Sequence, residues 1–174
     1  GYHALESLRM EKAYRAWGTD LTDLDTPIEA GLRFAVALDK PSGFTGKDAL
    51  LAQAERPGTK RLAVFTLDDP EPLLLGDEPI YRDNALVGRT TSGAYGHTVG
   101  RSVGLGYVES EAGVDAAYIR GGSYEIEIMD ERFAAIRAIP RVFLFDCCKS
   151  DMERYHWNRK ANNEMNTADP EGLE

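Results

Sequence analysis

The chain has 174 residues, 43% of them hydrophobic, which is enough for one domain with a core of its own. Its formal net charge is −9, from 20 Lys and Arg against 29 Asp and Glu, and a surplus of this sign repels nucleic acid and anionic membrane surfaces. No apolar run reaches the roughly 18–20 residues that span a bilayer. We therefore expect a soluble protein with neither nucleic acid nor a membrane as partner.

The chain opens on a segment in which apolar residues keep a roughly helical spacing, at Leu5, Leu8, Ala13 and Ala16. This spacing predicts a short amphipathic helix that carries Glu11 and ends near Gly18. Residues 19–27 hold three Asp, three Thr and a Pro, which favour turns because their side chains bond the backbone or remove a donor. A loop is predicted there, next to the carboxylate of Glu11.

Residues 31–38 are rich in apolar side chains and alternate imperfectly, which predicts a strand, and residues 39–43 form a turn cluster. Thr45 with Asp48 three residues later has the spacing of a capping box, so a helix is expected from there to Ala54. This helix should end before Arg56.

The rest of the chain to residue 139 predicts short strands at 61–67, 78–81, 86–91, 99–108, 118–119, 124–129 and 133–139. Residues 82–84 are a hairpin turn, and bends or bulges are expected at Gly100, Gly104 and Gly106. The expected fold class is mainly β with a few helices, an antiparallel β-barrel that is closed or nearly closed.

Beyond the barrel, residues 143–145 could add a last strand, and residues 146–174 form a polar tail with a short helix at about 150–160 and a disordered end. Adjacent Cys147 and Cys148 rarely bridge each other, so no disulfide is expected and a reducing compartment suits the chain. His3 and His156, with Cys147 and Cys148, lack the spacing of metal ligands, and GxGxxG does not occur. The sequence predicts neither a metal site nor a flavin fold within it.

Five stretches carry a resemblance to a known family: residues 7–11 (SLRME), 14–21 (YRAWGTDL), 26–32 (TPIEAGL), 44–50 (FTGKDAL) and 91–108 (TSGAYGHTVGRSVGLGYV). In this order they resemble the aminomethyltransferases, that is, the glycine-cleavage T-protein and the folate-binding half of dimethylglycine and sarcosine dehydrogenases. The resemblance implies the end of a central folate-binding domain at 1–30, a T-protein C-terminal barrel at 31–145 and a tail at 146–174.

In this family the Glu of the SLRLE-type motif grips the pterin of tetrahydrofolate, which implies that role for Glu11, since a carboxylate accepts two parallel N–H bonds. The alternative is a surface pair with Arg15. Lys40 stands where the family tends to carry a basic residue facing folate, or is a solvated turn residue. Tyr14 and Trp17 could stack on the pterin, or anchor the helix in the core.

Tyr95, His97 and Arg101 belong to the 91–108 stretch and could face an anionic folate tail, or hold the bend together by hydrogen bonds to backbone carbonyls. The Asp on which aminomethyl transfer depends lies in the N-terminal half of the family fold. The sequence therefore contains no catalytic residue by this resemblance, and we expect a fragment with little activity and weak folate binding.

The parent implied is an enzyme that passes a one-carbon unit from an amine such as dimethylglycine, sarcosine or glycine to tetrahydrofolate, with any FAD in an upstream domain. Its expected compartment is the cytoplasm, or the mitochondrial matrix in a eukaryote. The chain starts at Gly1 and ends in Leu173-Glu174, which suggests a piece of a longer protein whose N-terminal half is its partner. Through a face left bare, the piece could form a homodimer.

Three alternatives stay open. One is a folate-dependent demethylase of another methylated substrate. Another is a non-enzymatic folate-binding protein that assists iron–sulfur assembly, but that branch carries a Lys-Gly-Cys-Tyr-like motif where this chain has SGFTG at 42–46. The third is a structural barrel that docks on a partner through an exposed apolar face around Leu5, Leu8 and Trp17.

Overall fold

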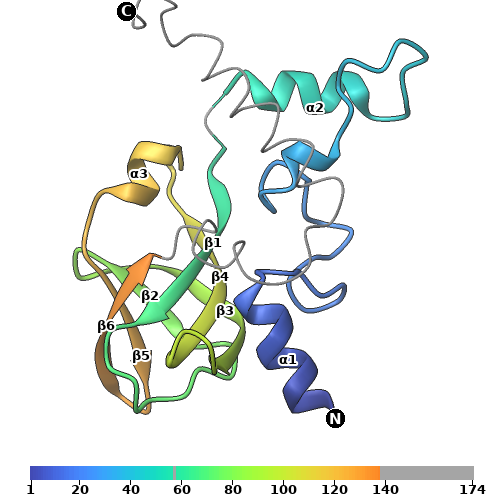
Figure 1. The fold of residues 1–174 in the computed structure, drawn as a ribbon. Helices are drawn as coiled ribbons and strands as arrows, with labels where there is room; N and C mark the ends of the chain where they lie inside the picture. Colours follow the sequence, from blue (N-terminus) through green and yellow to red (C-terminus); the bar gives the residue numbers. More distant parts are fainter. Residues whose placement is uncertain (57, 138–174) are drawn as a thin grey trace, which may run out of the picture. The chain divides into compact units, whose positions relative to one another are not determined.

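The computed structural model describes residues 1–56 and 58–137, all within a compact unit that spans Gly1–Phe143 (Figure 1). The predicted strand at 143–145, the predicted helix at 150–160, His156 and the two cysteines lie outside the described residues.

Six antiparallel strands close into a barrel, which confirms the predicted fold class (Figure 1). Around the barrel they follow one another as β1 (Lys60–Leu67), β4 (Arg101–Glu109), β3 (Ala85–Gly96), β2 (Pro79–Arg82), β5 (Tyr124–Ile128) and β6 (Glu131–Arg137), which returns to β1. Closure leaves no exposed sheet edge to be covered.

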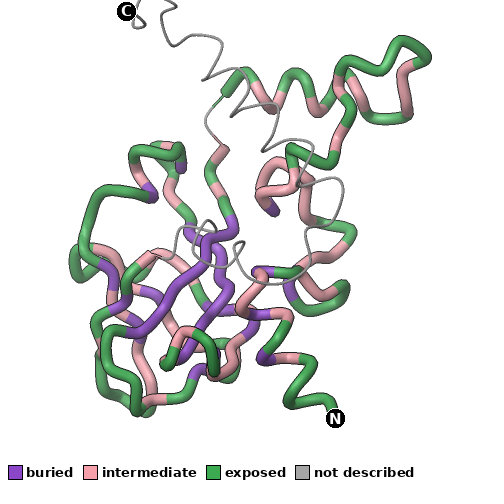
Figure 2. Tube along the Cα trace, viewed as in Figure 1, coloured by how far each residue is buried: buried purple, intermediate pink, exposed green. Residues whose placement is uncertain are grey.

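Strands β1 and β4 are buried on both faces, as the purple run through the middle of Figure 2 shows. Successive side chains of a strand point to opposite faces, so Phe65 belongs to the cluster inside the barrel and Val64 to a second cluster outside it. Phe65 lies opposite Gly104, and a large residue facing a small one fills the interior without a clash. Because both faces are covered, consecutive residues of these strands are buried rather than every second one.

The hairpin turn between β2 and β3 is confirmed, with Asp83 and Asn84 at φ 51° and 66°. The bend predicted at Gly100 is confirmed by its φ of 73°, but the predicted bulge is not at Gly104 or Gly106, which pair in continuous register with β1. It lies across the ladder in β3, where the register shifts between Thr90 and Ser92 and leaves Thr91 as the extra residue.

Helix α1 (Tyr2–Glu11) packs on β3 and β4 but ends well before Gly18, contrary to the prediction. Ala13 has a φ of 54°, a left-handed conformation that turns the chain away from the helix. The predicted apolar face is also wrong: the helix buries Ser7 and Met10, whereas Leu5 and Leu8 are exposed. Small Ser7 lets the helix approach the sheet, and its hydroxyl donates to the Tyr95 carbonyl at 2.7 Å.

Three further predictions are corrected or sharpened. Residues 31–38 form no strand but a 3-10 turn, η1 (Arg33–Ala35), and no residue of η1 is buried. Helix α2 (Lys47–Ala54) is confirmed, but it begins after Gly46 at φ 87° without the predicted capping box. Residues 118–119 belong to a helix, α3 (Ala116–Arg120), because the Asp115 carboxylate caps it by accepting from the Tyr118 amide.

Candidate functional site

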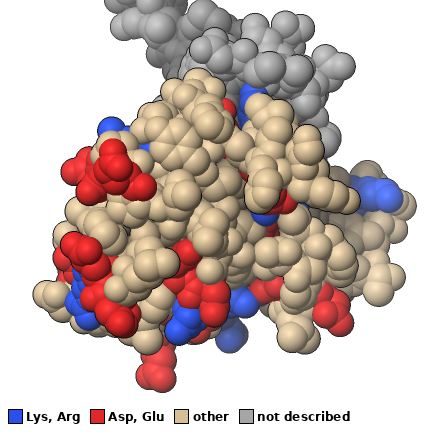
Figure 3. Space-filling view, turned by 90° about the horizontal axis from the view of Figure 1, so that it is seen from below, with Lys and Arg blue, Asp and Glu red and all other residues tan. Residues whose placement is uncertain are grey.

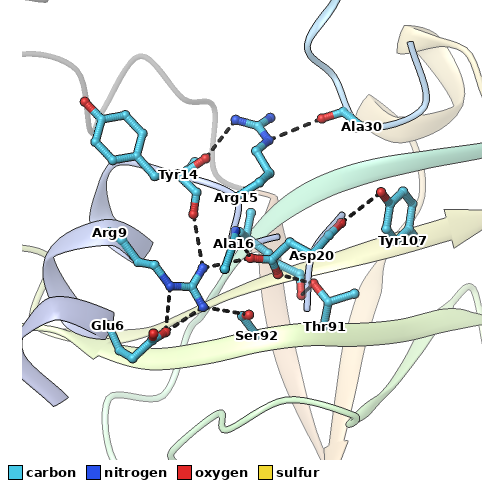
Figure 4. Close-up of polar contacts among 12 residues, drawn as sticks. Glu6, Arg9, Tyr14, Arg15, Ala16, Asp20, Ala30, Thr91, Ser92 and Tyr107 are labelled. Carbon is cyan, nitrogen blue, oxygen red and sulfur yellow. Dashed lines mark hydrogen bonds and ion pairs between the residues drawn. The ribbon is translucent and has the colours of Figure 1, made fainter. Parts of the chain in front are cut away.

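A buried ion pair joins α1 to the loop that follows it (Figure 4). Arg9 Nη1 lies 2.7 Å from Asp20 Oδ2, and the Asp20 side chain is fully buried. Glu6 holds the same guanidinium from its other edge, with Arg9 Nε 2.6 Å from Glu6 Oε2. Burial alone would lower the pKa of Arg9, but these two carboxylates outweigh it and raise that pKa.

The barrel provides the remaining partners of this pair. The bulge in β3 turns the Thr91 hydroxyl toward Asp20, to which it donates, and Arg9 Nη2 donates to Ser92 Oγ at 2.8 Å. From β4, the Tyr107 hydroxyl donates to the Asp20 carbonyl at 3.0 Å. Moving the loop away from the barrel would break these contacts and leave buried charges without partners, which costs free energy. The network therefore fixes the loop on the barrel.

Arg15 extends the network along the loop. Its Nη1 donates to the Ala13 carbonyl at 2.7 Å and its Nε to the Ala30 carbonyl at 3.2 Å, and burial lowers its pKa. These contacts exclude the pair between Arg15 and Glu11 that the sequence left open. Arg9 and Asp20 lie in the SLRME and YRAWGTDL stretches, but sequence reasoning missed their roles. The clue that could have indicated their pairing was that Arg9 and Asp20 carry opposite charges within short motifs that also hold several apolar residues.

Glu11 is the last residue of α1 and contacts the turn that joins β3 to β4. Its Oε1 accepts from the Thr98 amide at 2.6 Å. It also lines a hollow of about 360 Å³ together with His3, Ala4, Ser7, Leu8, His97 and Thr98. A carboxylate retains further lone pairs after one such bond, so Glu11 can accept from a ligand in this hollow.

Lys40, Tyr14 and Trp17 are not brought into this hollow. Lys40 is exposed in a turn, where its carbonyl accepts from Lys47 Nζ at 3.1 Å. Tyr14 is 47% and Trp17 75% exposed, so the interpretation of these rings as core anchors is wrong. Both rings are accessible to a ligand or a partner.

The three candidates from the 91–108 stretch separate. His97 lines the Glu11 hollow and packs edge-on against Tyr95, with ring centroids 5.2 Å apart. Arg101 instead turns to the end of β1, where its Nη1 lies 3.3 Å from the Leu67 carbonyl and from Asp68 Oδ1. Of the three, only His97 lines the hollow that Glu11 lines. Arg101 hydrogen-bonds a backbone carbonyl instead, which is the alternative to folate binding that the sequence left open.

The start of the chain exposes several large apolar side chains: Tyr2, Leu5, Leu8, Trp17 and Leu24. They include the three residues named for a docking face. Figure 3 shows acidic side chains on the face seen from below, with basic ones beside several of them, although most of that face is neither.

A second cavity of about 400 Å³ lies where residues 28–34, the end of α2, the start of β1 and the start of α3 meet. Both charge signs line it, with Glu29, Glu55 and Asp115 among the basic side chains of Arg33, Arg56, Lys60 and Arg61. Sequence reasoning assigned none of these residues to a binding site, although Glu29 lies in the 26–32 stretch that carries the family resemblance.

Within residues 1–56 and 58–137, no group of three or more His, Cys, Asp or Glu side chains is arranged to hold a metal ion. No helix of this part is both long and apolar enough to cross a membrane.

Comparison with family models agrees with this architecture. Residues 60–144, which include the whole barrel, match the glycine cleavage T-protein C-terminal barrel domain. Residues 1–40, which include α1 and the loop fixed by Asp20, match the GCVT N-terminal domain. The chain belongs to the glycine cleavage T-protein family, as the resemblance implied.

Curated relatives match 78% of the chain. One is 4-methylaminobutanoate oxidase (formaldehyde-forming) of Paenarthrobacter nicotinovorans, 43% identical, of which the chain covers 16%. Another is the mitochondrial pyruvate dehydrogenase phosphatase regulatory subunit of Mus musculus, 45% identical, of which it covers 17%. Human sarcosine and dimethylglycine dehydrogenases are 35% and 36% identical. The chain spans about a sixth of the length of such relatives.

A solved structure shares the fold. The crystal structure of glycine cleavage system aminomethyltransferase T from Bartonella henselae superposes with a TM-score of 0.67 over 81% of this chain and 38% of that one. At 24% sequence identity the likeness supports the fold alone.

Proposed function

We propose that this chain is the C-terminal part of an enzyme that passes a one-carbon unit from an amine to tetrahydrofolate. The observation that carries the proposal is the position of Glu11: its carboxylate lines a hollow between α1 and the β3–β4 turn, in a chain that matches both parts of the family fold. Sarcosine and dimethylglycine dehydrogenases among the relatives support an amine as donor.

The residues around the hollow suit a pterin. Glu11 retains acceptor lone pairs for ring N–H and amine groups, but because Oε1 already accepts from Thr98, it would hold a pterin mainly through Oε2. His97 lies beside it as a donor. The rings of Tyr14 and Trp17 do not line the hollow but are exposed, so they are accessible only to a part of the ligand that extends beyond it. When bound, tetrahydrofolate would supply the nitrogen that accepts the one-carbon unit.

Tyr95 packs against His97 beside the hollow, whereas Lys40 and Arg101 lie outside its lining, so a role for them toward the anionic folate tail would require a ligand that extends beyond the hollow. The polarising Asp, any FAD and the rest of the folate pocket would come from an upstream part of the parent, which is the partner that we propose for the exposed apolar residues of α1. The parent would act in the cytoplasm, or in the mitochondrial matrix of a eukaryote. By itself the chain would bind folate weakly and show little activity, and it could dimerise.

Two other functions have specific support. The 43% identity to an oxidase of 4-methylaminobutanoate favours a different methylated amine as donor. The 45% identity to a phosphatase regulatory subunit favours a binding module without catalysis. In that second case the Glu11 hollow would be a ligand-sensing or partner-binding site.

Calorimetric titration of the chain with tetrahydrofolate tests the proposal. We expect weak binding, weakened at least tenfold by Glu11→Gln, because a neutral amide loses the charge-assisted bond. Glu111→Gln, a charge change at an exposed position, is the control and should leave binding unchanged. Tight binding that survives Glu11→Ala would refute the site assignment, and heats at the level of buffer dilution would refute folate binding by this chain.

A further inference from the structure

One end of the barrel concentrates positive charge in a chain of net charge −9. A cavity of about 490 Å³ lies between the segment after α3 and the end of β6. Arg120, Ser123 and Arg137 contribute its polar lining, together with the ring of Tyr124. No carboxylate pairs with Arg120 or Arg137 within the described part of the chain.

Tyr124 adds a second, independent feature. The residue is 5% exposed, and its ring packs against Phe65 with centroids 5.3 Å apart. Its hydroxyl is the one buried side-chain polar atom among the described residues without a hydrogen-bond partner of normal geometry, and the guanidinium near it, that of Arg82, is a donor only and cannot accept the hydroxyl proton. A buried hydroxyl without a partner costs about 1–3 kcal/mol, so a group that accepts from it is favoured at this place.

The charges around the cavity indicate that the group accepting from the Tyr124 hydroxyl is an anion. Burial, followed by repulsion from Arg120 and Arg61, lowers the pKa of Arg137. Burial raises the pKa of Tyr124, but the nearby guanidinium of Arg82 opposes that rise. A water molecule could satisfy the hydroxyl, but only an anion would also relieve the repulsion among the arginines.

The walls of this site are fixed by neighbouring contacts. Arg82 stacks over the Tyr118 ring at 4.1 Å and pairs with Asp83 at 3.0 Å. Gly122, at φ 82°, leaves room for that guanidinium, since an added Cβ would lie 2.5 Å from Arg82 Nε. Arg82 is thereby held in place, while Arg120 and Arg137 stay available to a ligand.

We propose that this end of the barrel binds an oxyanion, a phosphate or a carboxylate group, which Arg120 and Arg137 hold and to which the Tyr124 hydroxyl donates. Guanidinium groups bind both anions with paired N–H donors. The site uses none of the residues assigned to folate.

Thermal unfolding of the full chain in phosphate, in succinate and in sodium chloride of equal ionic strength tests this. We expect phosphate or succinate at ten times its dissociation constant to raise the unfolding temperature by about 3 °C over chloride, and the more effective anion identifies the ligand class. Arg137→Gln and Tyr124→Phe should abolish the rise. Tyr124→Phe keeps the ring and removes only an unpartnered hydroxyl, so it should fold normally.

Arg132→Gln is the matched control, because Arg132 lies on the same strand but contacts Glu125, Glu127 and the Tyr81 ring. Its response to the effective anion should equal that of the unaltered chain. Equal unfolding temperatures in all three salts would overturn the proposal. A rise that persists in both Arg137→Gln and Tyr124→Phe would overturn it as well.

Discussion

Replacing Asp20 by Asn should destabilise the chain strongly, because it breaks the buried ion pair with Arg9. The Asp20 side chain is fully buried, and that of Arg9, 2.7 Å away, is 12% exposed. Removing one partner of a buried pair costs about 3–5 kcal/mol because the other charge is left without compensation. Arg9 keeps Glu6, which is 39% exposed, so we expect the lower end, about 3 kcal/mol.

Urea unfolding followed by circular dichroism measures this loss. With a slope of about 2 kcal/mol per molar urea, the midpoint should fall by about 1.5 M at unchanged slope. Asp23→Asn removes an exposed carboxylate from the same loop and is the control, expected to lie within about 0.25 M of the unaltered chain. A midpoint for Asp20→Asn inside that margin would show that the pair does not fix the loop on the barrel.

Two further predictions concern stability. Burial would raise the pKa of Asp25, but the hydrogen bond from Lys60 helps to hold this pKa below its ordinary value of 3.8. The ionised Asp25 therefore stabilises the folded chain above pH 3.8, and this stabilisation is lost as the pH falls through the folded-state pKa. Asp25→Asn should therefore cost about 1–2 kcal/mol at pH 7 in chemical unfolding, and the cost should shrink as the pH falls below 3.8 and through the folded-state pKa. A pH-independent cost would contradict this. Gly106→Ala would place a Cβ 2.8 Å from the Arg89 carbonyl, so we expect it to lower the free energy of unfolding by about 2 kcal/mol or more in thermal unfolding. Gly58→Ala is the control, because a Cβ there meets only ordinary contacts. Equal stability of the two variants would refute the prediction.

The barrel was predictable because its strands are runs rich in apolar, β-branched and aromatic residues, separated by recognisable turns such as Asp83-Asn84. The strand expected at 31–38 was not formed, although its apolar content fits one. Periodicity cannot tell a strand from an extended loop when no partner strand is available. Residues 118–119 became helical for a local reason, the cap at Asp115, which outweighed the β preference of Tyr and Ile.

The candidate site was predictable only in part. Glu11 and His97 were named from the family motifs and do share a hollow. The roles of Arg9 and Asp20 were missed, because their pairing depends on a left-handed turn at Ala13 and a bulge at Thr91 that no residue pattern announced. Contacts between residues more than seventy positions apart, such as that of Asp20 with Thr91, follow from strand register rather than from spacing.

The central claim is that the Glu11 hollow receives the pterin, and the backbone amide of Thr98 reports on it directly because it donates to Glu11. We predict that adding tetrahydrofolate to the isotope-labelled chain shifts the Thr98 and His97 amide resonances among the most strongly, and that Glu11→Gln removes these shifts. A spectrum in which other amides move while Thr98 and His97 stay in place would contradict the account.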